Sequence, residues 1–288
     1  MAMPTILSAT SIIESKIPQL KTFSKELKTR GIKPKLKVLL IGNNPASEIY
    51  VKNKQKRCHE LDIDFELVKL SSTVNENEVL KLIEDSNQDP KITGFFIQFP
   101  VPNHLKHLNF TQLINPEKDV DGFHFQNIKG IYNGKNEGLA PCTPTGIINL
   151  FKHYQINIEG KHIAIIGRSL IVGKPLALML TNHNATVTLC HSKTNNIASI
   201  TKAADIIIVA IGSANFLSKD HLSDDKKQII IDVGMNKLND QLVGDVNFSE
   251  VEKHVKAITP VPGGVGPLTV LSLMENILIA AEKQGKQV

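Results

Sequence analysis

The stretch KHIAIIGRSLIVGKPLALML, residues 161–180, decides the fold class. It reads as an apolar strand, a turn with two glycines and a helix, with Pro175 near the first helical turn, where its missing N–H costs nothing. Such a turn lets backbone N–H groups at a helix N-terminus approach a phosphate group. Its spacing departs from GxGxxG, because Ser169 replaces the middle glycine and the last one, Gly173, is displaced by one residue. Two glycines can also serve turn geometry alone, so both interpretations stay open.

Similar apolar runs recur along the chain. They lie at residues 36–42, 64–70, 92–99, 185–190, 204–212 and 227–234. Most are continuous rather than alternating, as parallel strands covered on both faces should be. Helical patterns such as 75–87 and 173–183 lie between them, which predicts an α/β fold with right-handed crossovers.

A break rich in Gly, Asn and Pro, YNGKNEGLAPCTPTG at residues 132–146, separates two halves of the chain. We place a domain boundary there, with an α/β domain over residues 1–140 and a second, Rossmann-like domain over residues 141–268. The last segment, TVLSLMENILIAAEKQ, predicts an apolar helix long enough to pack back across this boundary. Residues 269–288 are therefore assigned to the first domain.

Composition excludes several classes of function. The 288 residues carry 33 basic and 28 acidic side chains, and the basic excess is scattered, so a nucleic-acid partner is not expected. Cys58, Cys142 and Cys190 are far apart, which disfavours a disulfide framework or a structural metal and fits a reducing cytoplasm. The N-terminus lacks a signal-peptide pattern and no segment approaches the roughly 20 apolar residues of a membrane span, so neither export nor insertion is expected.

The strand after the glycine turn ends without an acidic residue. In NAD-binding units an Asp or Glu about 20 residues beyond the turn accepts the ribose hydroxyls. Here TVTLCHSKT, residues 186–194, offers Ser192 and Lys193 instead. With Arg168 directly after Gly167, these groups suit a 2′-phosphate, so the hypothesis is NADP rather than NAD. The alternative is that both cations are solvated surface residues.

A lysine shares a helix face with apolar residues in ASEIYVKNKQKRCHEL, residues 46–61. Tyr50, Lys54, Cys58 and Leu61 fall on one stripe, which points Lys54 inward or into a cleft. Desolvation there would lower the lysine's pKa toward the range in which it passes protons near neutrality. The alternative is a lysine whose stem covers apolar surface while its charge reaches water.

Two further polar residues stand at ligand-binding positions. Gln98 closes a continuous strand directly before PVP, and the carboxyl ends of parallel strands are where ligands bind in open α/β sheets. Asp121 lies in EKDVDGFH beside a glycine, where an Asx turn is the structural alternative.

The segment ITPVPGGVGPLT, residues 258–269, has three prolines and three glycines. It is rigid at its prolines and open to a ligand at its glycines. Thr269 is a candidate cap for the helix that follows.

Nine motifs in this order resemble one family, the bifunctional methylenetetrahydrofolate dehydrogenase/cyclohydrolases. They are SEIYVKNK, GFFIQFPVP, EKDVDGFH, PCTPTG, IGRSLIVGKP, CHSKT, DVGMN, VGDV and PVPGGVGPLT. The resemblance implies NADP-dependent oxidation of 5,10-methylenetetrahydrofolate to the methenyl compound. The resemblance further implies that hydrolysis to 10-formyltetrahydrofolate follows in the same cleft. It also implies a cytoplasmic homodimer that serves one-carbon metabolism and purine biosynthesis.

The resemblance assigns roles to individual residues. Lys54 is the key catalytic group, with Gln98 hydrogen-bonding near it and Tyr50 packing over the folate. The residues implied to bind substrate are Tyr50, Asp121, Pro262, Gly263 and Gly264, and those implied to bind the cofactor are Gly167, Arg168, Ser169, Ser192 and Thr269. No metal is implied.

Two other functions are kept as alternatives. One is an NADP enzyme of the same fold that performs only the dehydrogenase step. The other is a non-catalytic NADP-binding sensor, which the inward Tyr50 and Lys54 disfavour. In the half of the chain expected to bind the nucleotide, the segments GSANF and SKDHLSDDKKQ differ from the sequences usual in the family, which leaves the affinity for the cofactor open.

Overall fold

The structure is a computed structural model that describes residues 3–135, 137–239 and 241–286, and it divides into two compact units. Unit 1 comprises Met1–Glu14 and Thr143–Thr269, and unit 2 comprises Ser15–Cys142 and Val270–Val288. The helices that contain the divisions are α1 (Thr10–Thr29), α6 (Cys142–His153) and α10 (Val265–Gly285). The division after Cys142 lies two residues beyond the expected end of the first domain at residue 140, and the later division falls next to residue 269.

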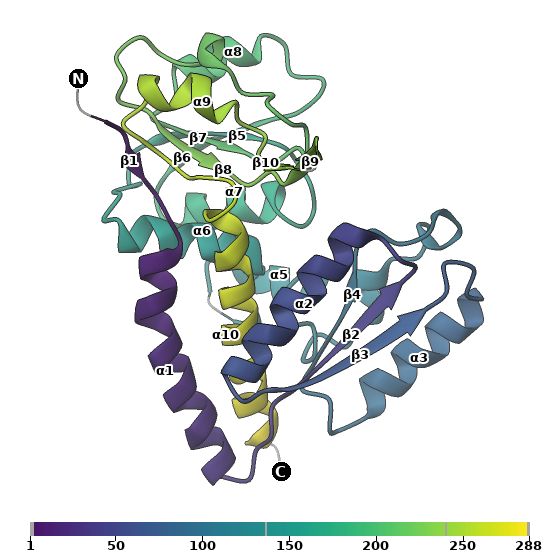
Figure 1. Ribbon diagram of the computed structural model, residues 1–288. Coiled ribbons are helices and arrows are strands. Elements are labelled where there is room, and N and C mark those ends of the chain that lie inside the picture. Colours follow the sequence, from purple (N-terminus) through teal and green to yellow (C-terminus); the bar gives the residue numbers. More distant parts are fainter. Residues whose placement is uncertain (1–2, 136, 240, 287–288) are drawn as a thin grey trace. The chain divides into compact units, whose positions relative to one another are not determined.

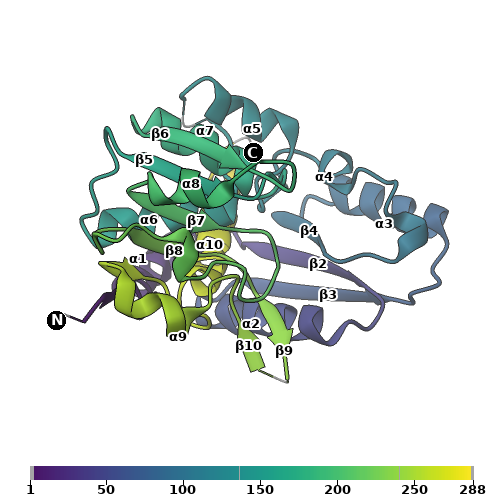
Figure 2. The ribbon, with the colours of Figure 1, turned by 90° about the horizontal axis from the view of Figure 1, so that it is seen from above.

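Unit 1 is built on a six-stranded parallel sheet in the order β1-β11-β8-β7-β5-β6. Figure 1 labels β1 and Figure 2 shows β8, β7, β5 and β6 of this sheet. The strands are β1 (Thr5–Ile6), β5 (His162–Ile166), β6 (Thr186–Cys190), β7 (Ile206–Val209), β8 (Ile229–Asp232) and β11 (Ala257–Ile258). From β5 the chain moves outward to β6 and then returns to the other side of β5 at β7. This reversal creates a switch point between β5 and β7, the place where ligands bind in doubly wound sheets.

The central strands β5, β7 and β8 of unit 1 are largely apolar runs because both faces of the sheet are covered there. All four residues of β7 and of β8 are buried, and the glycine turn leads from β5 into α7 (Gly173–Asn182). The remaining elements are α8 (Ile197–Lys202), η2 (Lys219–His221), β9 (Asn236–Leu238), β10 (Gln241–Val243), α9 (Phe248–Val251) and η3 (Glu252–His254). The strands β9 and β10 form an antiparallel hairpin.

The N-terminal segment belongs to unit 1, which corrects its expected assignment to the domain of residues 1–140. In the structure Thr5 and Ile6 pair in parallel with β11, and the Tyr154 hydroxyl donates a 2.8 Å hydrogen bond to the Ser8 carbonyl. Leu7 is 1% exposed, so this segment belongs to the core of unit 1. A two-residue strand carries no periodicity of its own, which is why the sequence placed it in the other domain.

Unit 2 contains a three-stranded parallel sheet in the order β3-β2-β4. The strands are β2 (Lys35–Ile41), β3 (Asp64–Leu70) and β4 (Gly94–Gln98), and the helices are α2 (Pro45–Glu60), α3 (Glu76–Gln88), η1 (Asn103–Leu105), α4 (Phe110–Leu113) and α5 (Phe125–Tyr132). Phe95 and Ile97 of β4 pack with α3 in one apolar cluster. Phe96 and Gln98 point to the other face, because successive side chains of a strand alternate.

Asparagine caps mark the starts of α2 and α3 in unit 2. The Asn44 side chain accepts a 3.0 Å hydrogen bond from the Ser47 N–H, and Pro45 occupies the first position of α2. The Asn75 side chain caps α3 in the same way through the Asn77 N–H at 2.8 Å. Asparagine caps supply an acceptor to N–H groups that have no partner within the helix.

The start of α10 differs from the sequence expectation. The helix begins at Val265, so Thr269 is an internal residue and not a cap. Pro267 lies in the first turn of the helix, where proline is tolerated, and this allows the proline- and glycine-rich segment to run directly into the helix.

With its early start, α10 is long and apolar enough to cross a membrane by length and composition, although the sequence predicted no such segment. The helix is nevertheless 61% buried inside the protein over its apolar window, as the core helix of a globular domain is. Its C-terminal part packs on unit 2, as expected. The Gln284 amide donates 3.0 Å hydrogen bonds to the carbonyls of Thr93 and Glu117.

Candidate active site

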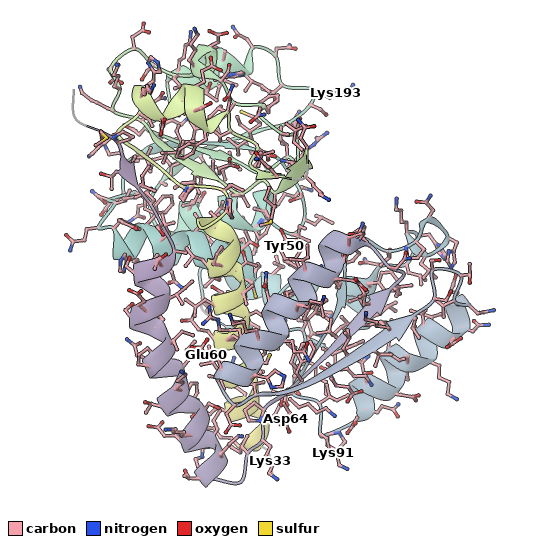
Figure 3. The ribbon with its side chains drawn as sticks, viewed as in Figure 1. Lys33, Tyr50, Glu60, Asp64, Lys91 and Lys193 are labelled. Carbon is pink, nitrogen blue, oxygen red and sulfur yellow. The ribbon has the colours of Figure 1, made fainter. Side chains whose placement is uncertain are left out.

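The inner face of α2 buries a lysine. Lys54 is 8% exposed, whereas Lys52 and Lys56 of the same helix are exposed. The buried residues of this face are Ser47, Val51, Lys54, Cys58 and Leu61. The predicted inward orientation of Lys54 is therefore confirmed, while Tyr50 is only partly buried at the edge of the face. Figure 3 shows Tyr50 near the opposite end of α2 from Glu60.

The Lys54 ammonium meets two side chains of β4. Its Nζ donates to the Gln98 Oε1 at 3.1 Å and lies 3.9 Å from the centre of the Phe96 ring. The Gln98 Nε2 donates to the Phe99 carbonyl at 2.9 Å, which turns the amide oxygen toward the lysine. The amide is thus held at both ends, and it can only accept from Lys54.

Burial and charge act on Lys54 in opposite directions. Burial lowers the pKa of Lys54, and the nearby Asp121 carboxyl acts to raise it, with smaller contributions from the thiols of Cys142 and Cys58. Burial likewise raises the pKa of Asp121, and the lysine opposes that rise. The two groups are therefore coupled, so a change in the charge of one shifts the proton affinity of the other.

Asp119, not Asp121, organises the turn in EKDVDGFH. The Asp119 carboxylate accepts hydrogen bonds from the N–H of Gly122 at 3.2 Å, from the N–H of His124 at 2.6 Å and from the Asn127 Nδ2 at 3.0 Å. Gly122 has φ +78°, and a Cβ there would lie 2.5 Å from the Ala140 carbonyl carbon. Among the described residues no hydrogen bond reaches the Asp121 side chain, so its carboxylate is available to a ligand.

An asparagine of α10 holds the backbone beside Asp121. The Asn276 Nδ2 donates 2.8 Å hydrogen bonds to the carbonyls of Val120 and Ala140, and the Cys142 N–H donates to the Asp121 carbonyl at 3.3 Å. Sequence reasoning missed both Asp119 and Asn276. For Asp119 the sequence offered one local signal, namely a second aspartate in the motif. For Asn276 it offered none, because nothing in the helix pattern marks that residue as a contact of a distant loop.

The glycine turn of unit 1 is sterically tight. Gly167 has φ +126°, and a Cβ on it would lie 2.3 Å from the Ala210 carbonyl oxygen. A Cβ on Gly173 would lie 1.9 Å from the Gly167 oxygen. Between them the Ser169 Oγ accepts from the N–H groups of Val172 and Gly173 at 3.1 and 3.4 Å. The departure from GxGxxG therefore replaces a glycine with a side chain that accepts from two N–H groups at the start of α7.

The side chains of Arg168, Ser192 and Lys193 are exposed near this turn of unit 1. Within the part of the chain that the structure describes, neither Arg168 nor Lys193 forms an ion pair. Figure 3 shows Lys193 extending from unit 1, and its backbone is held in a turn by a 3.1 Å hydrogen bond to the His191 Nδ1. Unpaired cations beside a glycine turn suit a phosphate group.

Comparison with known proteins decides the family. The catalytic-domain model of tetrahydrofolate dehydrogenase/cyclohydrolase matches residues 7–121, and the NAD(P)-binding-domain model of the same family matches residues 141–285. The chain belongs to the tetrahydrofolate dehydrogenase/cyclohydrolase family. Unit 2 holds most of the matched catalytic region, and unit 1 holds most of the matched NAD(P)-binding region.

Relatives of this family match over almost the whole chain. The bifunctional protein FolD of Brevibacillus brevis is 43% identical over 284 residues, covering 98% of this chain and 99% of the relative. That of Ligilactobacillus salivarius is 48% identical over 258 residues, covering 89% and 90%. The crystal structure of the bifunctional FolD dehydrogenase/cyclohydrolase from Campylobacter jejuni gives a TM-score of 0.92 at 43% identity, with 97% and 99% coverage. The Trypanosoma brucei enzyme, solved with NADP and an inhibitor, gives 0.92 at 29% identity, with 98% and 99% coverage.

The proline- and glycine-rich segment of this family member lies in unit 1. Gly263 has φ +105°, and its carbonyl accepts a 2.8 Å hydrogen bond from the Ala9 N–H. The Val261–Pro262 bond is cis, and a Cβ on Gly264 would lie 2.5 Å from the Pro260 oxygen. Thr269 shares a 3.0 Å hydrogen bond with the Thr143 hydroxyl. The predicted site residues therefore lie in three places. Tyr50, Lys54, Gln98 and Asp121 lie in unit 2, whereas the residues of the glycine turn with Ser192, and those of the proline- and glycine-rich segment with Thr269, lie in unit 1.

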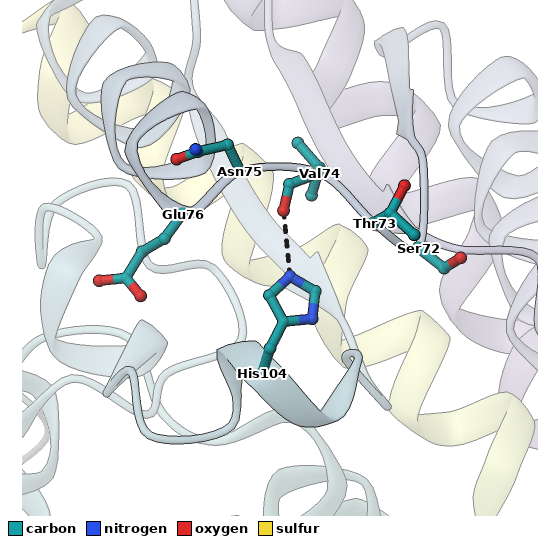
Figure 4. A pocket seen from close by; sticks show the side chains of 6 residues that line it. All are labelled: Ser72, Thr73, Val74, Asn75, Glu76 and His104. Carbon is teal, nitrogen blue, oxygen red and sulfur yellow. Dashed lines mark hydrogen bonds between the residues drawn. The ribbon is translucent and has the colours of Figure 1, made fainter.

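A separate hollow of about 490 Å³ contains none of the predicted site residues (Figure 4). It is lined by Ser72, Thr73, Val74, Asn75, Glu76 and His104. The ring of His104 is 3.0 Å from the Val74 carbonyl, and Glu76 pairs with His107 at 3.1 Å. Its acidic and histidine groups are already partnered. Over residues 3–135, 137–239 and 241–286, no group of His, Cys, Asp or Glu side chains is arranged to hold a metal ion.

Proposed function

We infer that the protein oxidises 5,10-methylenetetrahydrofolate to 5,10-methenyltetrahydrofolate with NADP, and then hydrolyses the methenyl compound to 10-formyltetrahydrofolate. The observation that carries this conclusion is the buried Lys54, hydrogen-bonded to Gln98 and coupled to Asp121, in a chain that matches both domains of the family. Relatives that match nearly all of the chain are named bifunctional, which favours two activities over dehydrogenase activity alone.

In the first step the protein mainly orients its substrates. Hydride leaves the methylene carbon, and the resulting cation is stabilised by the folate nitrogens, so no protein base is needed at that carbon. Bound NADP supplies the hydride acceptor. We propose that Asp121 accepts hydrogen bonds from the pterin and that Tyr50 packs on the folate ring. In support, the Asp121 side chain has no hydrogen bond among the described residues, and Tyr50 lies one helical turn before Lys54 on α2.

We propose that Arg168, Ser192 and the adjacent Lys193 bind the 2′-phosphate of NADP, and that the turn of Gly167 and Ser169 approaches the pyrophosphate. Two exposed cations that form no ion pair among the described residues, beside a turn in which a Cβ on Gly167 or Gly173 would clash, fit this role. We assign Pro262, Gly263, Gly264 and Thr269 to the region that meets both ligands, as the family resemblance implies.

The second step consumes water and releases a proton. Water adds to the methenyl carbon, the bond from that carbon to N5 breaks, and the formyl group remains on N10. We propose that a neutral Lys54 Nζ accepts the proton of the attacking water. The lowered pKa of Lys54 supports this role, because the neutral amine must be present near pH 7 for it to act as a base. The fixed Gln98 oxygen holds the amine in place.

The test is an absorbance assay of the purified protein with methylenetetrahydrofolate and either NADP or NAD. We expect NADP-dependent formation of methenyltetrahydrofolate, followed by its enzyme-dependent decay. Accumulation of the methenyl compound with decay only at the spontaneous rate would show a dehydrogenase-only enzyme. Absence of any oxidation with either nucleotide would favour the non-catalytic sensor.

We also propose that the protein is a cytoplasmic homodimer whose product supplies formyl groups to purine biosynthesis. The free and buried state of Cys58, Cys142 and Cys190 agrees with a reducing compartment, and the dimer rests on the family resemblance. Sedimentation velocity of the purified protein tests the dimer, because a single monomeric species at micromolar concentration would contradict it.

A further inference from the structure

A fully buried carboxylate organises the turn after β7 in unit 1. Asp245 is 0% exposed, and its Oδ2 accepts from the N–H groups of Ile211 and Gly212 at 2.7 and 3.0 Å. Its Oδ1 accepts from the Ser213 N–H at 2.8 Å and from the Asn236 Nδ2 at 2.9 Å. All four acceptor positions of the carboxylate are thus used, three of them by consecutive backbone groups.

A second buried carboxylate holds Asp245 in place. Asp232, 3% exposed, accepts from the backbone N–H groups of Asp245 and Val246 at 2.9 and 3.0 Å. Glycines leave room for both acids: a Cβ on Gly234 would lie 2.1 Å from the Asp245 Cγ, and a Cβ on Gly244 would lie 1.8 Å from the Asp232 Oδ2. The motifs DVGMN and VGDV therefore form one buried network.

The turn held by Asp245 lies directly beside the glycine turn. The strand β7 neighbours β5, and a Cβ on Gly167 would lie 2.3 Å from the Ala210 oxygen and 3.4 Å from the Ile211 Cγ2. Ile211 is 38% exposed, so part of its apolar side chain is accessible at this strand end. The switch point of the sheet thus has the phosphate-type turn on one side and an apolar side chain on the other.

Three consecutive N–H groups in a turn form a concavity that suits an anion. Asp245 fills this concavity from inside the protein, so a phosphate cannot use it. We propose that Asp245 is a positioning residue of the nucleotide site: it fixes the turn of residues 210–213 so that Ile211 contacts an uncharged part of the dinucleotide, a ribose or a base. The phosphates are left to the turn at Gly167 and to Arg168. This inference rests on the proposed use of NADP.

The experiment compares D245N with I211A and with D225N as the matched control. Asn in place of Asp245 keeps the shape of the side chain, but its NH2 group faces backbone N–H groups and cannot accept from them. The control residue, Asp225, is an exposed aspartate of unit 1 that accepts from the Ser223 hydroxyl and the Lys227 N–H in a local turn. For each variant the KM for NADP, the dehydrogenase kcat at saturating NADP and the cyclohydrolase rate are measured. The cyclohydrolase step needs no nucleotide, so it reports the integrity of the enzyme in the same sample.

We expect D245N and I211A to raise the KM for NADP by about tenfold or more, with the cyclohydrolase rate within about twofold of the wild type and D225N unchanged. An unchanged KM in I211A, or equal losses of both activities in soluble D245N, would overturn the inference. If D245N does not fold, I211A decides alone, since its partly exposed side chain can be truncated without opening the core. A wild-type enzyme that oxidises no substrate with NADP would refute the proposed function instead.

Discussion

The Lys54 Nζ donates to the Gln98 Oε1 at 3.1 Å, and the other end of that amide is anchored on the Phe99 carbonyl. The amine therefore sits against a fixed acceptor and an aromatic face, with one carboxylate, Asp121, in electrostatic reach. This arrangement keeps a lysine inside the protein while leaving its proton affinity sensitive to the charge of Asp121.

Replacement of Lys54 by methionine should abolish most of the cyclohydrolase activity. The apolar side chain fills the same volume but cannot take a proton from water, so the hydrolysis rate should fall by about 10²-fold or more. The decay of purified methenyltetrahydrofolate measures this directly. K56M, at an exposed lysine of the same helix, is the control. Hydrolysis at the wild-type rate in K54M would exclude Lys54 as the base.

Asn in place of Asp121 should move the pH dependence of hydrolysis toward lower pH. The Asp121 carboxylate raises the pKa of Lys54, so its removal lowers that pKa and leaves more neutral amine at a given pH. The limb of the kcat profile that rises with pH should shift to the acid side in D121N, while the KM for folate increases. A shift in the alkaline direction would contradict the coupling.

The variant R168A should weaken the binding of NADP much more than the binding of NAD. Loss of a charge-assisted hydrogen bond to a phosphate costs about 1.5–3 kcal/mol, or roughly 10- to 150-fold in the KM for NADP. The ratio of kcat/KM for the two nucleotides is the measurement, and K202A, at another exposed cation of unit 1, serves as the comparison. Equal effects on both nucleotides would mean that Arg168 does not contact the 2′-phosphate.

Truncation of the Asn276 side chain should destabilise unit 2. N276A leaves the buried carbonyls of Val120 and Ala140 without the amide, which costs about 1–3 kcal/mol in the free energy of unfolding. Thermal unfolding followed by circular dichroism should show a lower Tm. The same loss should raise the KM for folate, because the backbone beside Asp121 is released. A Tm within the error of the wild type would show that the two hydrogen bonds are dispensable.

The pattern of apolar and polar residues along the chain was enough to predict several elements of this fold. The seven longer parallel strands were predictable from their apolar runs, although β3 and β6 are only partly buried. Helical spacing alone predicted that Lys54 of α2 points inward. The glycine turn was predictable too, since backbone geometry at Gly167 and Gly173 permits no side chain.

The tertiary structure decided what depends on partners distant in sequence. It paired β1 with β11 and made Asp119 the acceptor that holds the turn in EKDVDGFH, while among the described residues no hydrogen bond reaches the Asp121 side chain. It also started α10 at Val265, brought Asn276 to the loop beside Asp121, and made Asp245 the ligand of three backbone amides. None of these leaves a periodic mark, because a two-residue strand or a single buried polar contact is specified by the group it meets. The sequence therefore determined the elements and the chemistry they carry, and only long-range packing determined which polar groups are already occupied and which remain available to a ligand.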